Sequence, residues 1–132
     1  MADVMQFELV SPERSLASLQ ATEVRIPGAE GDLTAMPDHA PVITTLRPGV
    51  VRVVADGTTT EYFVTGGFAE ITQSATSILA EHAMPVSDVT ADMISKLVDT
   101  AEAAVESAAD DRKDAVTKYA ADILSVKTAL GV

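Results

Sequence analysis

The sequence predicts an α+β protein that is mainly β, with an antiparallel β sandwich or flattened barrel followed by an antiparallel hairpin of two helices. Two periodicities lead to this prediction. Apolar and polar residues alternate as far as about Met84, and from Ser87 onward the apolar residues recur about every 3.6 positions. A packed core is also expected, because 47% of the 132 residues are hydrophobic. Only 4% are aromatic, so this core should consist mainly of Val, Leu, Ile and Ala.

Short strands are predicted in the first part of the chain, where runs rich in Val, Ile, Thr, Tyr and Phe are separated by Gly, Pro and Asp. In chain order, these runs are FELV, EVRI, GVVRVV, TEYFV, AEIT and SILA. Asp56-Gly57 predicts a hairpin turn, because these residue types adopt the positive φ values that such a turn needs. Gly66-Gly67 lies inside a strand pattern and predicts a bulge or a close approach of two backbones.

Two helices are predicted in the last third of the chain, with a reversal at Asp110–Asp114, whose sequence is DDRKD. Ser87, Asp88 or Thr90 can cap the first helix, because their side-chain oxygens accept hydrogen bonds from the free N–H groups of a first turn. The predicted contact faces consist of Met93, Leu97, Ala101, Ala104, Val105 and Ala108 in the first helix, and of Val116, Tyr119, Ala120, Ile123, Val126 and Leu130 in the second.

The predicted helical hairpin has a contact face rich in alanine, which buries little apolar area per residue. Two helices of this length are only marginally stable alone in water. We therefore expect the hairpin to be stabilised by contact with the β domain or with a partner, and to be able to move. The boundary is predicted near Pro85, which gives a β domain of residues 1–85 and a helical domain of residues 86–132.

The charge balance excludes several classes of partner. The chain has 20 acidic and 9 basic residues, a net charge of −11, and no basic stripe, so nucleic acid is rejected as a partner. An acidic surface also disfavours anionic lipid. No run approaches the about 20 apolar residues of a membrane span, and the first residues do not resemble a signal peptide. We expect a soluble, cytoplasmic protein without direct membrane insertion.

Motifs for catalysis or cofactor binding are not found in the sequence. No phosphate-binding Gly-x-x-x-x-Gly-Lys and no Gly-x-Ser-x-Gly elbow is present, and without cysteine there is no thiolate metal site. His39 and His82 are too far apart in the sequence to suggest a metal site, so no metal, cofactor or catalytic residue is expected. Glu30 and Asp32 allow an acid/base pair, a calcium loop, a solvated hairpin tip or an interface. The surrounding Gly/Pro-rich stretch favours a stiff interaction platform.

An ordered set of motifs runs through the β part of the chain, and with the two-helix tail the resemblance that it carries covers essentially the whole chain. It consists of FELVSPER, VRIPGAEGDLTAMPDHAPVITTLRPGVVRV, EYFVTGGFAEI and SILAEHA. Together with the two-helix tail, these motifs resemble the ε subunit of bacterial F-type ATP synthases, which is equivalent to the mitochondrial δ subunit. The resemblance implies a ten-stranded antiparallel β sandwich followed by a helical hairpin. It also implies a non-catalytic rotor subunit of the central stalk, which couples c-ring rotation to ATP synthesis at the cytoplasmic face of the bacterial inner membrane.

The resemblance further implies which residues meet which partners. The loop that touches the c-subunit ring in the family corresponds to Glu30, Gly31 and Asp32, and Asp32 stands where the family has an acid used in that contact. The positions that face the γ subunit correspond to Ser11, His39 and Thr44.

The tail departs from the family pattern. Many bacterial members bind ATP through Ile/Leu-Asp-x-x-Arg-Ala at the start of the first helix, but here Thr90 replaces the acid and Met93 replaces the arginine. We therefore predict that ATP binding is absent or weak. In the family the tail can also brake ATP hydrolysis through basic residues that contact an acidic segment of the catalytic subunits. With 5 bases and 9 acids after Pro85, this tail is expected to contact the α and β subunits transiently and to brake weakly.

Two other classes of function remain open at this point. One is a free-standing module that binds a small molecule or a nucleotide in the β domain or between the domains. The other is a small β-sandwich hydrolase that uses Glu30 and Asp32.

Overall fold

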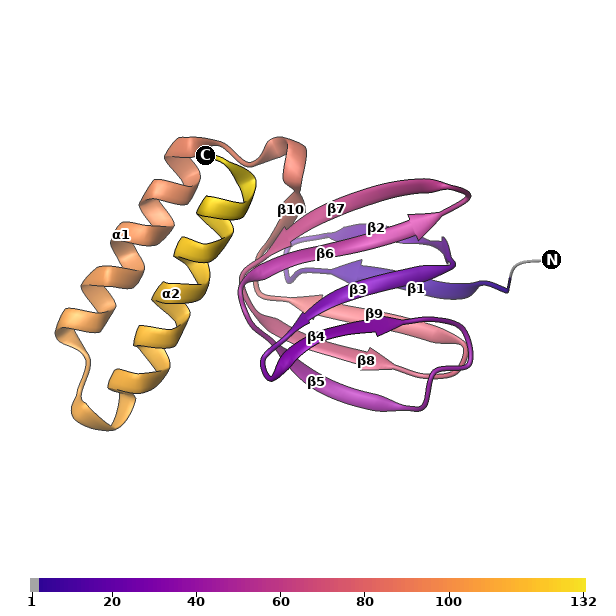
Figure 1. Cartoon of the computed structure of the whole chain (residues 1–132), viewed down its shortest axis with the longest axis horizontal. Helices are drawn as coiled ribbons and strands as arrows, with labels where there is room; N and C mark the ends of the chain where they lie inside the picture. The colour runs from indigo at the N-terminus through magenta and orange to yellow at the C-terminus, as the bar shows by residue number, and fades with distance from the viewer. Residues whose placement is uncertain (1–2) are drawn as a thin grey trace. The chain divides into compact units, whose positions relative to one another are not determined.

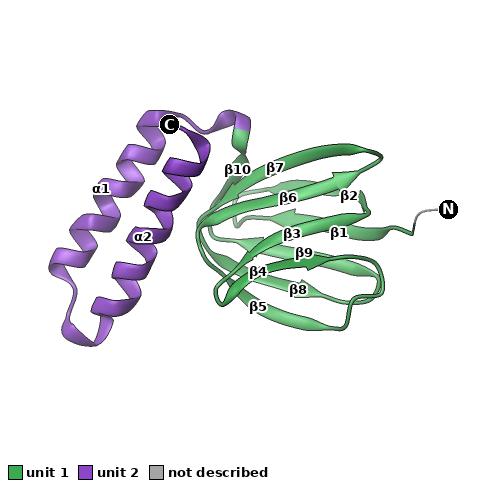
Figure 2. Ribbon diagram, viewed as in Figure 1, with its two compact units in different colours: residues 1–86 green, residues 87–132 purple. Residues whose placement is uncertain are grey.

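The computed structural model describes residues 3–132 and divides the chain into two compact units (Figure 2). The β unit ends at Val86 and the helical unit begins at Ser87. The division lies next to the boundary predicted near Pro85. Within the described residues, no helix is long and apolar enough to cross a membrane.

The β unit contains ten strands in one hydrogen-bonded sheet. Nine of them follow the order β10-β7-β6-β3-β5-β8-β9-β1-β2, and β4 lies off this path, paired to β3. The path turns between two layers at a single residue pair, Gly28 of β3 opposite Leu46 of β5 (Figure 1). The strands are β1 (Met5–Val10), β2 (Ser15–Ala21), β3 (Glu23–Gly28), β4 (Gly31–Ala35), β5 (Val42–Leu46), β6 (Gly49–Ala55), β7 (Thr58–Val64), β8 (Gly67–Ile71), β9 (Ala75–Ala80) and β10 (Ala83–Pro85).

The predicted β sandwich of ten strands followed by a helical hairpin is confirmed, and one strand pair departs from its antiparallel pattern. Every strand pair in the described part of the chain is antiparallel except β1 with β9, which run parallel, with Phe7 opposite Thr76. A parallel pair needs a long crossover connection, and the whole of β2–β8 lies between these two strands. The alternation of apolar residues is the same in both orientations, so the sequence pattern carried no information on this point.

The core of the β unit is mainly aliphatic, as expected from the composition, and includes the aromatic residues Phe7 and Tyr62. Phe7, Leu9, Ile26, Ile71 and Ile78 are among its fully buried members. Burial of each such side chain contributes about 1.5–3 kcal/mol to folding. Inward positions alternate with outward ones along strands such as β1 and β9, which directs their apolar residues into one interior.

Glycines determine two local features that the sequence predicted. Asp56 and Gly57 have φ values of 51° and 74°, which confirms the hairpin turn between β6 and β7. At Gly67 a Cβ atom would lie 2.0 Å from the Leu79 carbonyl oxygen, so only glycine fits. The close approach predicted for this segment is therefore confirmed.

The helical unit consists of α1 (Ala91–Ser107) and α2 (Lys113–Leu130). Of the three candidate caps, Thr90 is the one used, because its hydroxyl accepts a hydrogen bond of 3.2 Å from the Met93 N–H. The reversal includes a short 3₁₀ turn at Asp110–Arg112, and α2 ends at Gly131, whose φ is 71°.

The predicted contact face of α1 is wrong at Met93, which is exposed, and it misses Ile94, which is fully buried. The rest of the predicted face, from Leu97 to Ala108, is buried or half-buried, so the stripe differs from the prediction only in its first turn. In α2 the prediction agrees better, because Ile123 and Val126 are buried. Among the described residues of both helices, the buried set is Ile94, Ala101, Ile123 and Val126.

Candidate functional site

The tip of the β3–β4 hairpin carries the residues predicted to contact the c ring. Gly28 and Gly31 face each other across the two-residue turn Ala29-Glu30. A Cβ atom at Gly28 would lie 2.5 Å from the Gly31 carbonyl oxygen, and Gly31 has a φ of +143° that other residues rarely adopt. The turn therefore depends on both glycines. Glu30, Gly31 and Asp32 are all exposed.

The tip is bound to the end of β5 by its backbone and by one side chain. The Ala29 N–H donates to the Thr45 carbonyl at 2.9 Å, and the Arg47 N–H donates to the Pro27 carbonyl at 3.0 Å. The Arg47 guanidinium donates from Nη1 to the Gly28 carbonyl and from Nη2 to Asp32 Oδ1. Asp32 is therefore paired within the chain, whereas Glu30 makes no ion pair with any described residue.

The residues predicted to face γ lie at three separate places. The Ser11 hydroxyl is buried at the end of β1 and donates to the Arg14 carbonyl at 3.3 Å. His39 is half-buried in the turn before β5, with its Nδ1 2.6 Å from the Ala40 carbonyl oxygen. Because a carbonyl only accepts, this contact requires a proton on Nδ1. Thr44 is half-buried on β5.

An exposed apolar patch lies on β5, β8 and β9, the neighbouring strands that include Thr44. It consists of Ile43, Phe68 and Leu79, whose residues are 70%, 55% and 53% exposed. Phe68 is opposite Leu79 on β9 and opposite Thr45 on β5, and Leu79 is opposite Val10 on β1. Ser11 follows Val10 and Thr44 precedes Thr45, so both are next in sequence to the ends of this cross-strand row. Thr44 is opposite the buried Ala69 and belongs to the other face of the sheet. Large exposed apolar residues on neighbouring strands are typical of an interaction surface.

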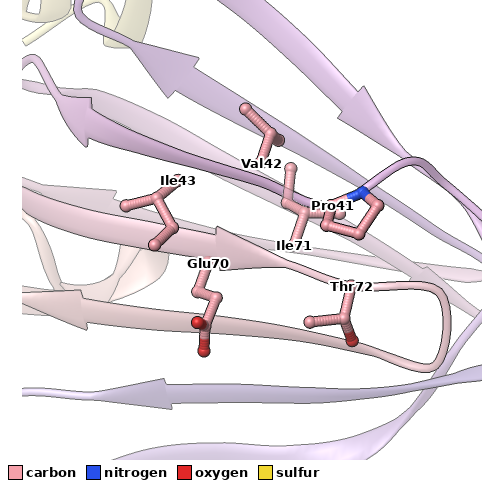
Figure 3. Close-up of a pocket in the computed structure, with 6 residues that line it drawn as sticks. All are labelled: Pro41, Val42, Ile43, Glu70, Ile71 and Thr72. Carbon is pink, nitrogen blue, oxygen red and sulfur yellow. The ribbon is translucent and has the colours of Figure 1, made fainter.

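A shallow depression of about 350 Å³ adjoins the apolar patch at the start of β5. Figure 3 shows its lining: Pro41, Val42, Ile43, Glu70, Ile71 and Thr72. Ile43 is directly opposite Glu70 in the β5–β8 ladder. The depression is thus apolar with one carboxylate beside it, and it lies close in sequence to His39.

The patch was not predicted from the sequence. A signal was nevertheless present, because Ile78-Leu79-Ala80 and Val42-Ile43 are continuous apolar runs where a half-exposed strand should alternate. Such runs indicate a strand with two apolar faces, one for the core and one for a partner.

No group of three or more His, Cys, Asp or Glu is placed to hold a metal ion within residues 3–132. Asp32 is engaged by Arg47, and the hairpin tip contributes no residue to the depression. The arrangement of exposed turn, apolar patch and shallow depression suits binding to proteins.

The start of α1 shows what replaces the family's nucleotide motif. The Thr90 hydroxyl oxygen caps the helix, because it accepts a hydrogen bond from the backbone N–H of Met93. Neither side chain carries a charge for phosphate. The absence of ATP binding remains a prediction.

Comparisons with known proteins find similarity to chains of ATP synthases. Residues 4–86 match the family model "ATP synthase, Delta/Epsilon chain, beta-sandwich domain". The ATP synthase epsilon chain of Jannaschia sp. (strain CCS1) is 56% identical over 119 residues, 90% of each chain. That of Ruegeria sp. (strain TM1040) is 54% identical over 132 residues, which cover 99% of this chain and 96% of the relative.

A solved structure of the Euglena gracilis mitochondrial ATP synthase, comprising OSCP, F1 and the c-ring, contains a chain of similar fold. The two chains superpose with a TM-score of 0.75 at 20% sequence identity, over 96% of this chain and 80% of that one. At this level of identity the likeness concerns the fold alone.

Proposed function

The chain belongs to the family of ATP synthase delta/epsilon chains, and we propose that it is a non-catalytic subunit of the central stalk of a proton-translocating F-type ATP synthase. In this role it couples rotation of the c ring to ATP synthesis in the catalytic head. The observation that carries the proposal is the pairing of two separate exposed surfaces, the hairpin tip and the apolar patch, on one hydrogen-bonded β unit.

Transmission of torque requires a body that does not deform between its contacts. The β unit fits this requirement, since its strands form one continuous ladder around a fully buried core. A flexible loop would deform under torque, whereas two contacts on one packed sandwich transmit the torque from one partner to the other.

The surface proposed to bind γ is the apolar patch, with Ser11 and Thr44 next in sequence to the ends of its cross-strand row and His39 in the turn before β5. Burial of Phe68 and its neighbours would supply most of the affinity, because a few large central side chains dominate most interfaces. The adjacent carboxylate of Glu70 favours a basic or hydrogen-bond-donating group on the partner beside an apolar one.

The surface proposed to rest on the c ring is the tip formed by Glu30, Gly31 and Asp32. Its exposed acids suit a polar loop that carries amide or basic groups. Through this contact the protein is proposed to lie peripherally at the cytoplasmic face of the bacterial inner membrane, held by the complex rather than by insertion.

The helical unit is proposed to act as a weak brake through transient contacts with the α and β subunits. Its bases are outnumbered by acids, and Lys118 is already paired with Asp122 at 2.9 Å. Isothermal titration with ATP is expected to show no binding in the micromolar range, and a micromolar dissociation constant would contradict this part of the proposal.

The test of the proposal is whether the chain associates with the complex and whether coupling depends on it. Membranes stripped at low ionic strength should release it together with γ, α and β, and its removal should abolish proton-driven ATP synthesis. Phe68→Asp should prevent rebinding, while Thr60→Asp at an exposed site on β7 should not. A free protein that melts in a ligand-dependent manner, with synthesis unaffected by its loss, would instead indicate a ligand-binding module.

A further inference from the structure

Arg47 holds the hairpin tip in three ways. Its backbone N–H donates to the Pro27 carbonyl, and its guanidinium donates to the Gly28 carbonyl and to the Asp32 carboxylate. All three acceptors belong to the β3–β4 hairpin, whereas Arg47 follows directly after β5. One side chain thus joins the strand that carries Thr44 to the turn that carries Glu30.

The two segments are in close contact, with little room for rearrangement. A Cβ atom at Gly49 would lie 2.6 Å from Pro27 Cβ, and one at Gly28 would lie 3.6 Å from the Thr44 hydroxyl. Gly28 and Leu46 form the one residue pair between β3 and β5 in the described structure. Beyond this pair, the side chain that links the hairpin tip to the end of β5 is Arg47, through the two hydrogen bonds of its guanidinium.

We propose that Arg47 is a positioning residue, a latch that fixes the hairpin tip for its contact with the c ring, and that Asp32 serves as the anchor of this latch. Glu30 is then the acid presented to the ring. This inference rests on the proposed function and refines its ring contact, because the acid expected to meet the ring is already neutralised within the chain.

The chemistry of the guanidinium explains why arginine suits this place. Its planar fork donates in two directions at once, to a backbone carbonyl and to a carboxylate. A lysine ammonium lacks this fixed geometry. Exposed ion pairs contribute little to global stability, and Asp32 is half exposed, so the latch acts on local geometry rather than on the stability of the whole sandwich.

The competing explanation is that Asp32 binds the ring directly and that Arg47 is an incidental neighbour. The two explanations predict opposite changes in coupling for Arg47→Met. This substitution keeps an unbranched apolar stem but removes the guanidinium. A direct ring ligand would be freed by this change, so coupling would be unchanged or improved. A latch would be lost, and coupling would fall.

The test uses the complete ATP synthase, reconstituted into liposomes with wild-type or variant chain, and measures protons pumped per ATP hydrolysed. Arg47→Met and Asp32→Asn should each lower this ratio several-fold, with Arg47→Lys in between. The double variant should be no worse than either single one, since the two residues act as a unit. Glu30→Gln should lower the ratio while leaving the latch intact.

Two controls separate local positioning from general damage. Arg25→Met changes an exposed arginine of β3 whose side chain makes no hydrogen bond or ion pair with the described residues, and the variant should pump like wild type. In the isolated full-length chain, Arg47→Met should speed amide hydrogen exchange at residues 28–32 and leave the melting temperature nearly unchanged.

The outcomes distinguish this inference from the proposed function. If the wild-type chain does not restore coupling at all, the proposed function fails. If wild type restores coupling but Arg47→Met matches or exceeds it, or if the effects of Arg47→Met and Asp32→Asn add, the latch is refuted.

Discussion

The β unit and the helical unit bury their residues in very different ways. The β unit encloses a core of large, fully buried side chains, Phe7, Leu9, Ile26, Ile71 and Ile78 among them. In the described part of the helical unit the buried set has only four members, one of them an alanine. The difference indicates that stiffness resides in the β unit, where the proposed contacts lie, and that the helical unit is the part able to rearrange at low cost.

The largest effect is expected in the β core. Phe7→Ala should lower the free energy of unfolding by about 3–5 kcal/mol, because it leaves a cavity in a closely packed interior. Urea denaturation monitored by circular dichroism measures this change. Leu124→Ala, at a half-exposed position on α2, is the control and should change it by less than about 0.5 kcal/mol. A loss below about 1 kcal/mol at Phe7 would mean that the sandwich is not the rigid part.

The apolar patch should show the next largest effect, on binding instead of stability. Phe68→Ala should weaken association with γ by about 2 kcal/mol, the usual loss for a central interface side chain. Calorimetric titration with purified γ provides the measurement. The control is Thr60→Ala on β7, which should bind normally. Equal affinity of both variants would remove the patch from the interface.

The helical unit should respond to a smaller change at its cap. Thr90→Ala removes the hydroxyl that accepts from the Met93 N–H, and it should destabilise the helices by about 1 kcal/mol. The helical signal at 222 nm during urea titration detects it. Thr128→Ala, within α2, removes a hydroxyl bound to the preceding turn and should be close to neutral. If the β unit were the part affected by Thr90→Ala, the two units would not be separable in stability.

The smallest effect concerns the ion pair between Lys118 and Asp122. Lys118→Gln should cost about 0.3–0.5 kcal/mol at low ionic strength and nothing measurable in high salt, as for other exposed pairs four residues apart. Thermal melting at two salt concentrations tests this. A loss that persists in molar salt would show that Lys118 contributes by packing.

Local features were the most predictable part of the fold. The turn at Asp56-Gly57, the close approach at Gly67 and the cap at Thr90 each follow from the conformational limits of a few neighbouring residues. The strand and helix segments likewise follow from hydrophobic period, which is a local signal.

Features that join distant residues were not accessible from one sequence. The parallel β1–β9 pair depends on chain path, which alternation does not encode. Ile94 is buried in place of Met93, and the sequence could not decide between them because positions 93 and 94 both continue the helical spacing of three or four residues before Leu97. The bond between Arg47 and Asp32 spans 15 residues and depends on how β5 meets β3, so Asp32 looked like a free acid in the sequence.

The central claim is that the β unit couples the rotor and that the helical unit brakes hydrolysis only weakly. It is tested most directly by reconstituting the ATP synthase with the full-length chain, with a chain that ends at Val86, or with no such chain. The rates of ATP synthesis and of ATP hydrolysis are then measured separately. Both forms should restore proton-driven ATP synthesis, with little difference in hydrolysis. Failure of the shortened chain to restore synthesis, or a several-fold rise in hydrolysis on its use, would contradict the claim.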